Sequence, residues 1–461
     1  MRASDVEIES DPSTHVACPP PPLPRNQADQ ADMLDIKAIR ANSKEIEARL
    51  RRRAPDIDLS EIETLDRDRL GLLQSVERLK ARRNEISKEV GKRKKAGEDA
   101  DSLIADTRAL GEELAGGQDR LVELEKRIDE IVIALPNLPH PDVIPGGDPS
   151  QAQTIREEGD RLTKSATGEN HVQIATRLGL LDLARASRLA GSHFALHRGW
   201  GARIEWSLLR FMIDLHVGES GYELILPPFV ANTETLTASG QLPKFADQVY
   251  RCADDDLYLI PTAEVPLTAF HRSEILDEAS LPLRYCAYTP CFRREAGAHG
   301  ASERGLIRTH QFNKVEIYRF TTPESSYEQL EILVRQAEEV VRRLGLHFRT
   351  VRLVAGDLAQ QAAMTYDVEV YIPGQERYYE VSSISNCEEY QARRSRIRYR
   401  PIGGGKARYV HTLNGSALAT SRLLAAIIET YARADGGLDI PEVLRPHLAE
   451  ASVIHPDGST S

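Results

Sequence analysis

A heptad pattern between residues 60 and 135 constrains this chain more than any other feature. In its first segment apolar residues recur every seventh position, at Leu65, Leu72, Leu79 and Ile86, beside the seam positions Ile62, Val76 and Val90. The second segment repeats this spacing in two registers, at Leu103, Leu110, Leu124 and Ile131 and at Leu114, Leu121, Ile128 and Leu135. Residues 91–97 separate the segments. The pattern predicts two helices of about thirty residues, each roughly 45 Å long, in an antiparallel coiled-coil arm.

Two irregularities and one charge cluster mark this arm. Arg69 and Arg83 interrupt the first seam, and Gly116 and Gly117 weaken the second helix, because glycine costs about 1 kcal/mol against alanine. We therefore expect the arm to fray or bend near the two glycines. The turn carries a basic cluster, which is the predicted RNA-binding tip: Lys88, Lys92, Arg93, Lys94 and Lys95.

The charge of the whole chain makes this basic cluster informative. A run of Lys and Arg is most often only a solvated face. Here the net charge is -11, so the cluster stands out on an acidic protein and is suited to RNA phosphates. The arm contains no aromatic residue, which argues against recognition by base stacking.

Beyond residue 142 the sequence alternates short strands of period two with a few helices. The expected strands are residues 222–228, 249–260, 283–292, 311–320, 348–354, 366–372 and 377–382, and the expected helices are 203–217, 323–344 and 417–431. Strands outnumber the helices between them, which indicates an α+β fold with a largely antiparallel sheet flanked by helices. Neither a Gly-x-Gly-x-x-Gly nor a Walker sequence occurs, so Rossmann and P-loop sites are not expected.

Length and composition set the domain limits. The 461 residues suffice for two or three domains. We expect a disordered Pro-rich extension at 1–32, an N-terminal domain with the arm at 33–142, the sheet domain at 143–448 and a disordered tail at 449–461. The extension is acidic and lacks an apolar segment, so it is neither a signal nor a transit peptide.

Cysteine usage and hydropathy indicate the cellular setting. Five scattered cysteines without a Cys-x-x-Cys pair argue against a disulfide framework and against a zinc site. No apolar run reaches the 18 residues of a transmembrane helix. We expect a cytoplasmic protein with reduced cysteines, no zinc and no membrane contact.

Five short motifs follow one another in fixed order through the sheet domain. They are Pro261-Thr262-Ala263-Glu264, Phe292-Arg293-Arg294-Glu295, Asn313-Lys314-Val315-Glu316, Glu380-Val381-Ser382-Ser383, and His411-Thr412-Leu413-Asn414-Gly415-Ser416 running on to Arg422. Each is unremarkable alone, because an Arg-x-Glu is usually a surface ion pair and a Ser-rich segment is usually a turn. Together, and over residues 33–448, they resemble the class II aminoacyl-tRNA synthetases, most closely the bacterial seryl-tRNA synthetases.

The resemblance implies a site that activates serine with ATP. Arg293 and Arg422 would be the catalytic arginines, and rigid guanidinium forks suit phosphate and carboxylate groups. The serine contacts carried over are Thr262, Ala263, Glu264, Arg293, Glu316 and Ser416. The ATP contacts carried over are Arg293, Arg294, Glu295, Thr309, Glu380, Val381, Ser382, Ser383 and Arg422. Arg304 would add a cation over the ATP, and Glu380 and Ser383 would hold Mg²⁺, which prefers oxygen ligands.

The resemblance also implies partners. They are tRNA(Ser) and tRNA(Sec), whose long variable arm the coiled coil would grip, and a second copy of the chain, which would dock through the segment that ends at Pro228. Met364, Ala417 and Ser421 depart from the usual family pattern. Three alternatives therefore stay open: a duplicate or inhibitor-resistant copy, a related ligase that loads an amino acid onto a carrier protein, and a non-catalytic RNA-binding scaffold. Loss of the arm would favour the carrier-protein ligase, and loss of Arg293 or Arg422 would favour the scaffold. The arm and both arginines are present in the sequence.

Overall fold

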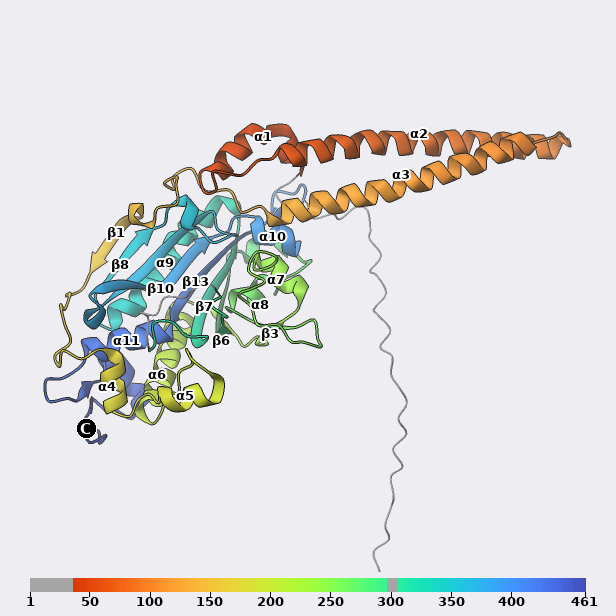
Figure 1. The fold of residues 1–461 in the computed structure, drawn as a ribbon. Coiled ribbons are helices and arrows are strands. Elements are labelled where there is room, and N and C mark those ends of the chain that lie inside the picture. Colours follow the sequence, from red (N-terminus) through yellow and green to blue (C-terminus); the bar gives the residue numbers. More distant parts are fainter. Residues whose placement is uncertain (1–35, 297–304) are drawn as a thin grey trace, which may run out of the picture. The chain divides into compact units, whose positions relative to one another are not determined.

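The computed structural model describes residues 36–296 and 305–461 (Figure 1). The expectations for residues 1–32 and for Arg304 lie outside this part of the chain. Within it, no helix is both long enough and apolar enough to cross a membrane.

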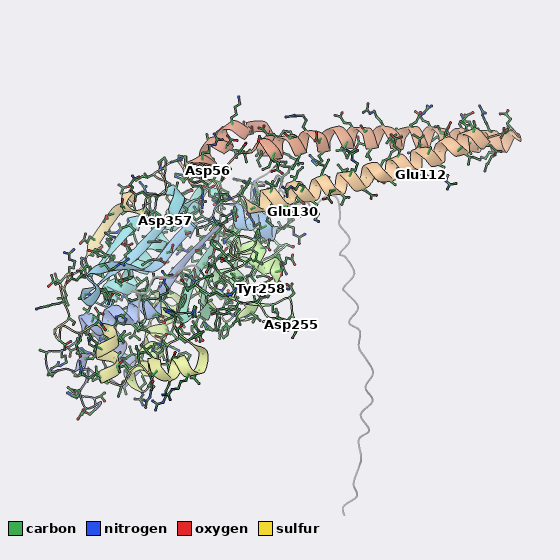
Figure 2. All side chains as sticks on the ribbon, in the orientation of Figure 1. Asp56, Glu112, Glu130, Asp255, Tyr258 and Asp357 are labelled. Atoms are coloured by element: carbon green, nitrogen blue, oxygen red, sulfur yellow. The ribbon has the colours of Figure 1, made fainter. Side chains whose placement is uncertain are left out.

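The predicted arm is confirmed as two long antiparallel helices, α2 (Ser60–Ala96) and α3 (Asp101–Ala134) (Figure 1). Ile62, Val76 and Ile86 of α2 and Leu114 and Ile128 of α3 are buried along the seam, as their heptad spacing requires. Charged side chains point outward; Figure 2 shows Glu112 and Glu130 projecting from α3.

The tip of the arm differs in detail from the expectation. α2 continues through Gly91 and ends at Ala96, and Gly97 then adopts a left-handed conformation with φ of 73° and caps the helix. Residues 92–95 therefore form the exposed last turn of α2, where cations also favour the negative end of the helix dipole.

The prediction of a frayed or bent arm at Gly116 and Gly117 is wrong. α3 runs through both residues without interruption. Gly117 is buried against α2, where an added Cβ would lie 3.0 Å from Cγ2 of Val76, whereas a Cβ on Gly116 would meet nothing within 4 Å. Close contact between the two helices thus offsets the low helix propensity of one glycine.

Helix α1 (Ile36–Arg51) completes the base of the arm. Its buried Ile39, Ile46 and Leu50 pack with Ile128 and Val132 of α3 in a separate hydrophobic cluster. This cluster gives the N-terminal region a core of its own.

The sheet domain is built on eight strands in the order β1-β8-β9-β10-β13-β7-β6-β2. The strands are β1 (Gln153–Glu158), β8 (Phe348–Arg352), β9 (Met364–Ile372), β10 (Arg377–Asn386), β13 (His411–Ala419), β7 (Gln311–Thr321), β6 (Leu283–Phe292) and β2 (Glu223–Ile225). Every neighbouring pair is antiparallel except β2 with β6. The antiparallel α+β prediction is confirmed.

Helices flank this sheet (Figure 1), and their apolar residues pack with those of the strands in the main hydrophobic core. The larger ones are α6 (Trp200–Asp214), α9 (Ser326–Arg343) and α11 (Thr420–Thr430). The smaller ones are α4 (His171–Arg177), α5 (Leu183–Ala190), α7 (Thr233–Ser239), α8 (Glu264–Thr268) and α10 (Tyr390–Ser395). α11 begins three residues later than expected, because β13 continues through Ala419.

Short strand pairs complete the domain. They are β3 (Val230–Ala231) with β4 (Tyr258–Leu259), β5 (Ile275–Asp277) and β12 (Arg408–Tyr409) with β11 (Arg398–Arg400), and β14 (Leu438–Asp439) with β15 (Val453–Ile454). The expected strand 249–260 is reduced to β4, because the acidic run that contains Asp255 forms an outer loop (Figure 2). The disordered tail is also corrected: β15 pairs with β14, and the main chain of Ser461 bonds to Val453.

The two glycines of α3 provide a matched test of the arm. Gly116→Ala should stabilise the arm by up to about 1 kcal/mol, because alanine favours the helix and the site is open. Gly117→Ala should gain less or lose stability, because Val76 must move. Hydrogen exchange of the α3 amides measures both variants, and equal stabilisation would contradict the close packing at Gly117.

Candidate active site

The largest hollow at the site is a cavity of about 380 Å³, which we call the main cavity. Eight of the predicted site residues line it: Thr262, Glu264, Arg293, Glu295, Glu316, Glu380, Ser383 and Ser416. They come from the segment that follows β6, from β7, β10 and β13, and from the residues just before and at the start of α8. The antiparallel sheet therefore gathers motifs that are far apart in sequence.

Strand alternation explains why β7 carries two charged residues at its centre. Lys314 and Glu316 lie two residues apart and share one face, whereas Val315 and Ile317 face the core behind the sheet. Ser416 of β13 pairs directly with Glu316, so both side chains line the same wall. Glu316 is 2 % exposed, so it is not a solvated residue at a strand edge.

A buried ionic cluster occupies this wall. Nζ of Lys314 lies 2.5 Å from Oε2 of Glu316 and donates to Oγ1 of Thr262 at 2.7 Å. Thr262 donates in turn to Oε2 of Glu316 at 3.2 Å. A buried carboxylate needs such partners, because an unpaired charge in the interior is very costly.

Glu264 is held by three amides. Its Oε1 accepts from Nε2 of Gln361 at 2.9 Å, from Nε2 of Gln391 at 2.6 Å and from Nδ2 of Asn414 at 3.2 Å. Burial, and next the charge of Glu316, nevertheless raise the pKa of Glu264 to about 7. The carboxyl is thus fixed in place while its charge state changes near neutral pH.

A smaller hollow of about 90 Å³, the second hollow, adjoins the main cavity and shares Arg293, Glu295, Lys314, Glu380 and Ser416 with it. It is also lined by the predicted residues Thr309, Val381 and Arg422. The shared residues show that a ligand spanning both hollows would meet both arginines.

Main-chain carbonyls orient Arg422, and an aromatic ring orients Arg293. Arg422 donates from Nε to the carbonyl of Ile307 at 3.0 Å and from Nη1 to the carbonyl of Glu380 at 2.7 Å. The guanidinium of Arg293 lies over the ring of Phe312, 5.3 Å from its centroid. Both cations are therefore placed before any ligand binds.

Three predicted site residues and the basic tip do not line either hollow. Ala263 is fully buried ahead of α8, Arg294 is exposed, and buried Ser382 donates to the carbonyl of Ser416 at 2.5 Å. The tip residues Lys88, Lys92, Arg93, Lys94 and Lys95 lie at the far end of α2. Of the three departures from the family pattern, Met364 and Ala417 pack in the core, and Ser421 lines the second hollow.

The sequence reasoning assigned no role to four residues that support the cluster. They are Lys314, Gln361, Gln391 and Asn414. Lys314 could have been found from its position two residues before Glu316 on a strand. The two glutamines carried no local signal, because their contacts to Glu264 depend on the tertiary structure.

The fold and this site define a class II aminoacyl-tRNA synthetase core. The family model for the tRNA synthetase class II core domain (G, H, P, S and T) matches residues 248–431. A Giardia lamblia prolyl-tRNA synthetase structure, 19% identical, shares this fold with a TM-score of 0.53 over 62% of this chain and 56% of that one.

More specific matches extend over nearly the whole chain. The seryl-tRNA synthetase N-terminal domain model matches residues 33–139. A serine–tRNA ligase from Thermodesulfovibrio yellowstonii is 48% identical over 90% of this chain and 99% of its own length. The structure of Pyrococcus horikoshii seryl-tRNA synthetase complexed with ATP is 37% identical, with a TM-score of 0.85 over 92% of this chain and 100% of that one. The chain belongs to the serine–tRNA ligase family.

The raised pKa of Glu264 predicts a pH profile. The resemblance implies that Glu264 receives the serine ammonium, and an ammonium requires the ionised carboxylate. We therefore expect kcat/KM for serine in ATP–pyrophosphate exchange to rise about tenfold per pH unit below 7 and to level off above it. Glu264→Gln should lose both this inflection and most of the activity.

The same pKa shift should make the folded state less stable as pH rises, whereas it makes the activity increase. A folded-state pKa above the ordinary value of 4.5 contributes stability that is present below pH 4.5 and lost as pH rises through 7. Glu264→Gln should therefore raise the melting temperature at pH 8. If the pH profile of kcat/KM for Glu264→Gln kept the inflection near pH 7, a group other than Glu264 would be responsible for it.

Proposed function

We propose that this chain activates L-serine with ATP and then transfers the serine to the 3′ end of tRNA(Ser). The ionic cluster of Lys314, Glu316 and Thr262, together with Glu264, carries this proposal. Lys314 of this cluster and the neighbouring Arg293 line both the main cavity and the second hollow. One wall can recognise a small polar amino acid while the adjoining hollow receives a nucleotide. Membership of the serine–tRNA ligase family supports the same overall reaction, an ATP-dependent ligation.

The main cavity suits serine. Glu264 and Thr262 receive the ammonium, and Glu316 and Ser416, which face each other across β7 and β13, receive the hydroxyl. A site that hydrogen-bonds a substrate hydroxyl rejects alanine strongly, because alanine would leave buried polar groups unpaired.

Activation then proceeds where the two hollows meet. The serine carboxylate attacks the α-phosphorus of ATP; a bond from carboxylate oxygen to phosphorus forms, and the bond to pyrophosphate breaks. Arg293 neutralises charge on the carboxylate and the α-phosphate, and Arg422 does so on the far side of the nucleotide. Glu295, held by Arg308 at 2.7 Å, accepts from the adenine amino group. In the second step the terminal ribose hydroxyl of tRNA attacks the seryl carbonyl, and AMP leaves.

The residues at Glu380 and Ser383 fit the Mg²⁺ that accompanies ATP. Both line the main cavity, and Asp367, paired with Ser383 across β9 and β10, keeps a buried Oδ1 without a hydrogen-bond partner. Carboxylate and hydroxyl oxygens with phosphates are the ligands that Mg²⁺ prefers. When bound, the ion would neutralise phosphate charge. Among residues 36–296 and 305–461, no group of three or more His, Cys, Asp or Glu residues forms a metal site by itself.

The arm supplies the RNA contact. Its exposed basic tip is suited to the phosphates of the variable arm of tRNA(Ser), and of tRNA(Sec) as a second acceptor.

We place the reaction in the cytoplasm, where the four described cysteines, all free, would stay reduced.

We further propose a homodimer through α6 and β2. β2 is an edge strand of the large sheet, and apolar side chains gather beside it: Trp206 is 62 % exposed, Leu226 71 % and Phe229 42 %. Trp206 and Phe229 both lie against Tyr288, with ring centroids 5.9 and 6.4 Å away. An exposed apolar patch on an edge strand indicates an interface.

Paired variants test the reaction and the arm together. Arg293→Ala should lower serine-dependent ATP–pyrophosphate exchange about 100-fold, because it removes a preorganised cation. Replacing Lys92, Arg93, Lys94 and Lys95 by alanine should leave exchange unchanged but raise KM for tRNA(Ser) about tenfold at physiological salt. Each variant controls for misfolding of the other.

The outcomes separate the alternatives. Charging should require the variable arm of tRNA(Ser), and tRNA(Sec) should be charged in the same assay. Exchange without charging of either tRNA would favour a carrier-protein ligase or a divergent copy. No exchange with serine would overturn the catalytic proposal.

The dimer has its own test. Sedimentation equilibrium should give twice the chain mass of 51.4 kDa, and Leu226→Arg should shift the population toward monomer. Leu189→Arg on α5, where the leucine is 76 % exposed, is the matched control and should leave the dimer intact. A monomeric wild-type chain would contradict the proposed interface.

A further inference from the structure

The base of the arm forms direct hydrogen bonds with a loop that lines the main cavity. We call residues 358–363, which precede β9, the pocket loop. Ala359 and Gln361 of this loop line the main cavity. The residues that bind the loop from the arm side, Arg53 and Asn137, lie about 200 or more residues away in sequence and outside the motifs of the site.

Arg53 caps the pocket loop with its guanidinium. It donates to the carbonyls of Leu358 at 2.7 Å, Ala359 at 3.0 Å and Ala362 at 3.3 Å, and also to Asn137 at 3.0 Å. Burial lowers the pKa of Arg53 to about 10, so it remains a cation near neutral pH. One side chain thus takes the role that a neighbouring strand would have: it donates hydrogen bonds to loop carbonyls that lie outside the sheet, at both ends of the loop.

Asn137 holds the middle of the same loop. Its Nδ2 donates to the carbonyl of Gln361 at 2.9 Å and to that of Cys387 at 2.9 Å, and its main-chain N–H donates to Gln360 at 2.8 Å. Asn137 is buried, so these bonds do not compete with water.

The loop passes this restraint to the substrate site through one side chain. Nε2 of Gln361 donates to Oε1 of Glu264 at 2.9 Å. The path from Arg53 or Asn137 to the carboxylate therefore consists of the loop backbone, one glutamine side chain and one hydrogen bond. A shift of the loop would move the donor that fixes Glu264.

We propose that Arg53 and Asn137 are positioning residues for the amino-acid substrate, which act on Glu264 through the pocket loop and Gln361. This inference rests on the proposed function. Glu264 and Gln361 line the main cavity but not the second hollow, so the effect of the two residues falls on serine binding and not on ATP binding or the chemical step.

The neighbouring Arg52 offers a matched control. Its guanidinium also donates to main-chain carbonyls, those of His140 at 3.2 Å, Pro141 at 2.8 Å and Val143. These carbonyls belong to the segment after α3, which does not line the main cavity. Loss of Arg52 therefore removes a comparable anchor of the arm base while Arg53 and Asn137 keep their own hydrogen bonds to the pocket loop.

Kinetics of ATP–pyrophosphate exchange, without tRNA, test the proposal. Arg53→Met and Asn137→Ala should each raise KM for serine about tenfold, as the loss of a buried hydrogen bond allows, with kcat and KM for ATP within about twofold of wild type. Arg53→Lys should restore part of the affinity. Arg52→Met should leave KM for serine unchanged.

A double-mutant cycle identifies the route. If Arg53 acts through Gln361, Arg53→Met should add little to the effect of Gln361→Leu. Additive effects, or an equal rise in KM for serine in Arg52→Met, would overturn the proposal, as would a fall in melting temperature without any change in KM. Absence of serine-dependent exchange in the wild-type chain would instead refute the proposed function.

Discussion

The buried ionic cluster on β7 is the interaction on which the site depends. Lys314 balances Glu316 inside the sheet, and Thr262 joins that pair to the start of α8, which carries Glu264. Two carboxylates this close in the interior repel each other, which contributes to the raised pKa of Glu264. A lysine, a hydroxyl and three amides form hydrogen bonds or an ion pair with the two buried carboxylates and offset the free-energy cost of their burial. The wall is therefore polar and its side chains are held in place before a substrate binds.

The antiparallel sheet makes this arrangement possible. Register fixes Ser416 opposite Glu316 and Ser383 opposite Asp367, so four side chains from four strands share one face. A one-residue slip would turn each set toward the core. The same strands send Val315 and Ile317 into the hydrophobic layer behind, so packing and chemistry are specified by a single alternation.

The two ends of the arm have different physical roles. The tip is exposed and basic, so the RNA contacts that we propose for it would be governed by charge and salt. The base is partly buried, and its contacts with the sheet domain include hydrogen bonds of fixed geometry through Arg53 and Asn137. Sequence patterns predict the first role, because charge clusters are local, but they give no sign of the second.

The sequence by itself determined the heptad arm, the antiparallel sheet and eight of the residues that line the main cavity, because each depends on local periodicity or on a motif. It did not determine the tip turn, the continuity of α3 at Gly117 or the order in the tail after residue 448. Nor did it determine the partners of Glu264, since Gln361, Gln391 and Asn414 are 97, 127 and 150 residues away. Only the tertiary structure decides such contacts, because a buried carboxylate takes whichever donors the packed strands and loops bring within hydrogen-bond distance.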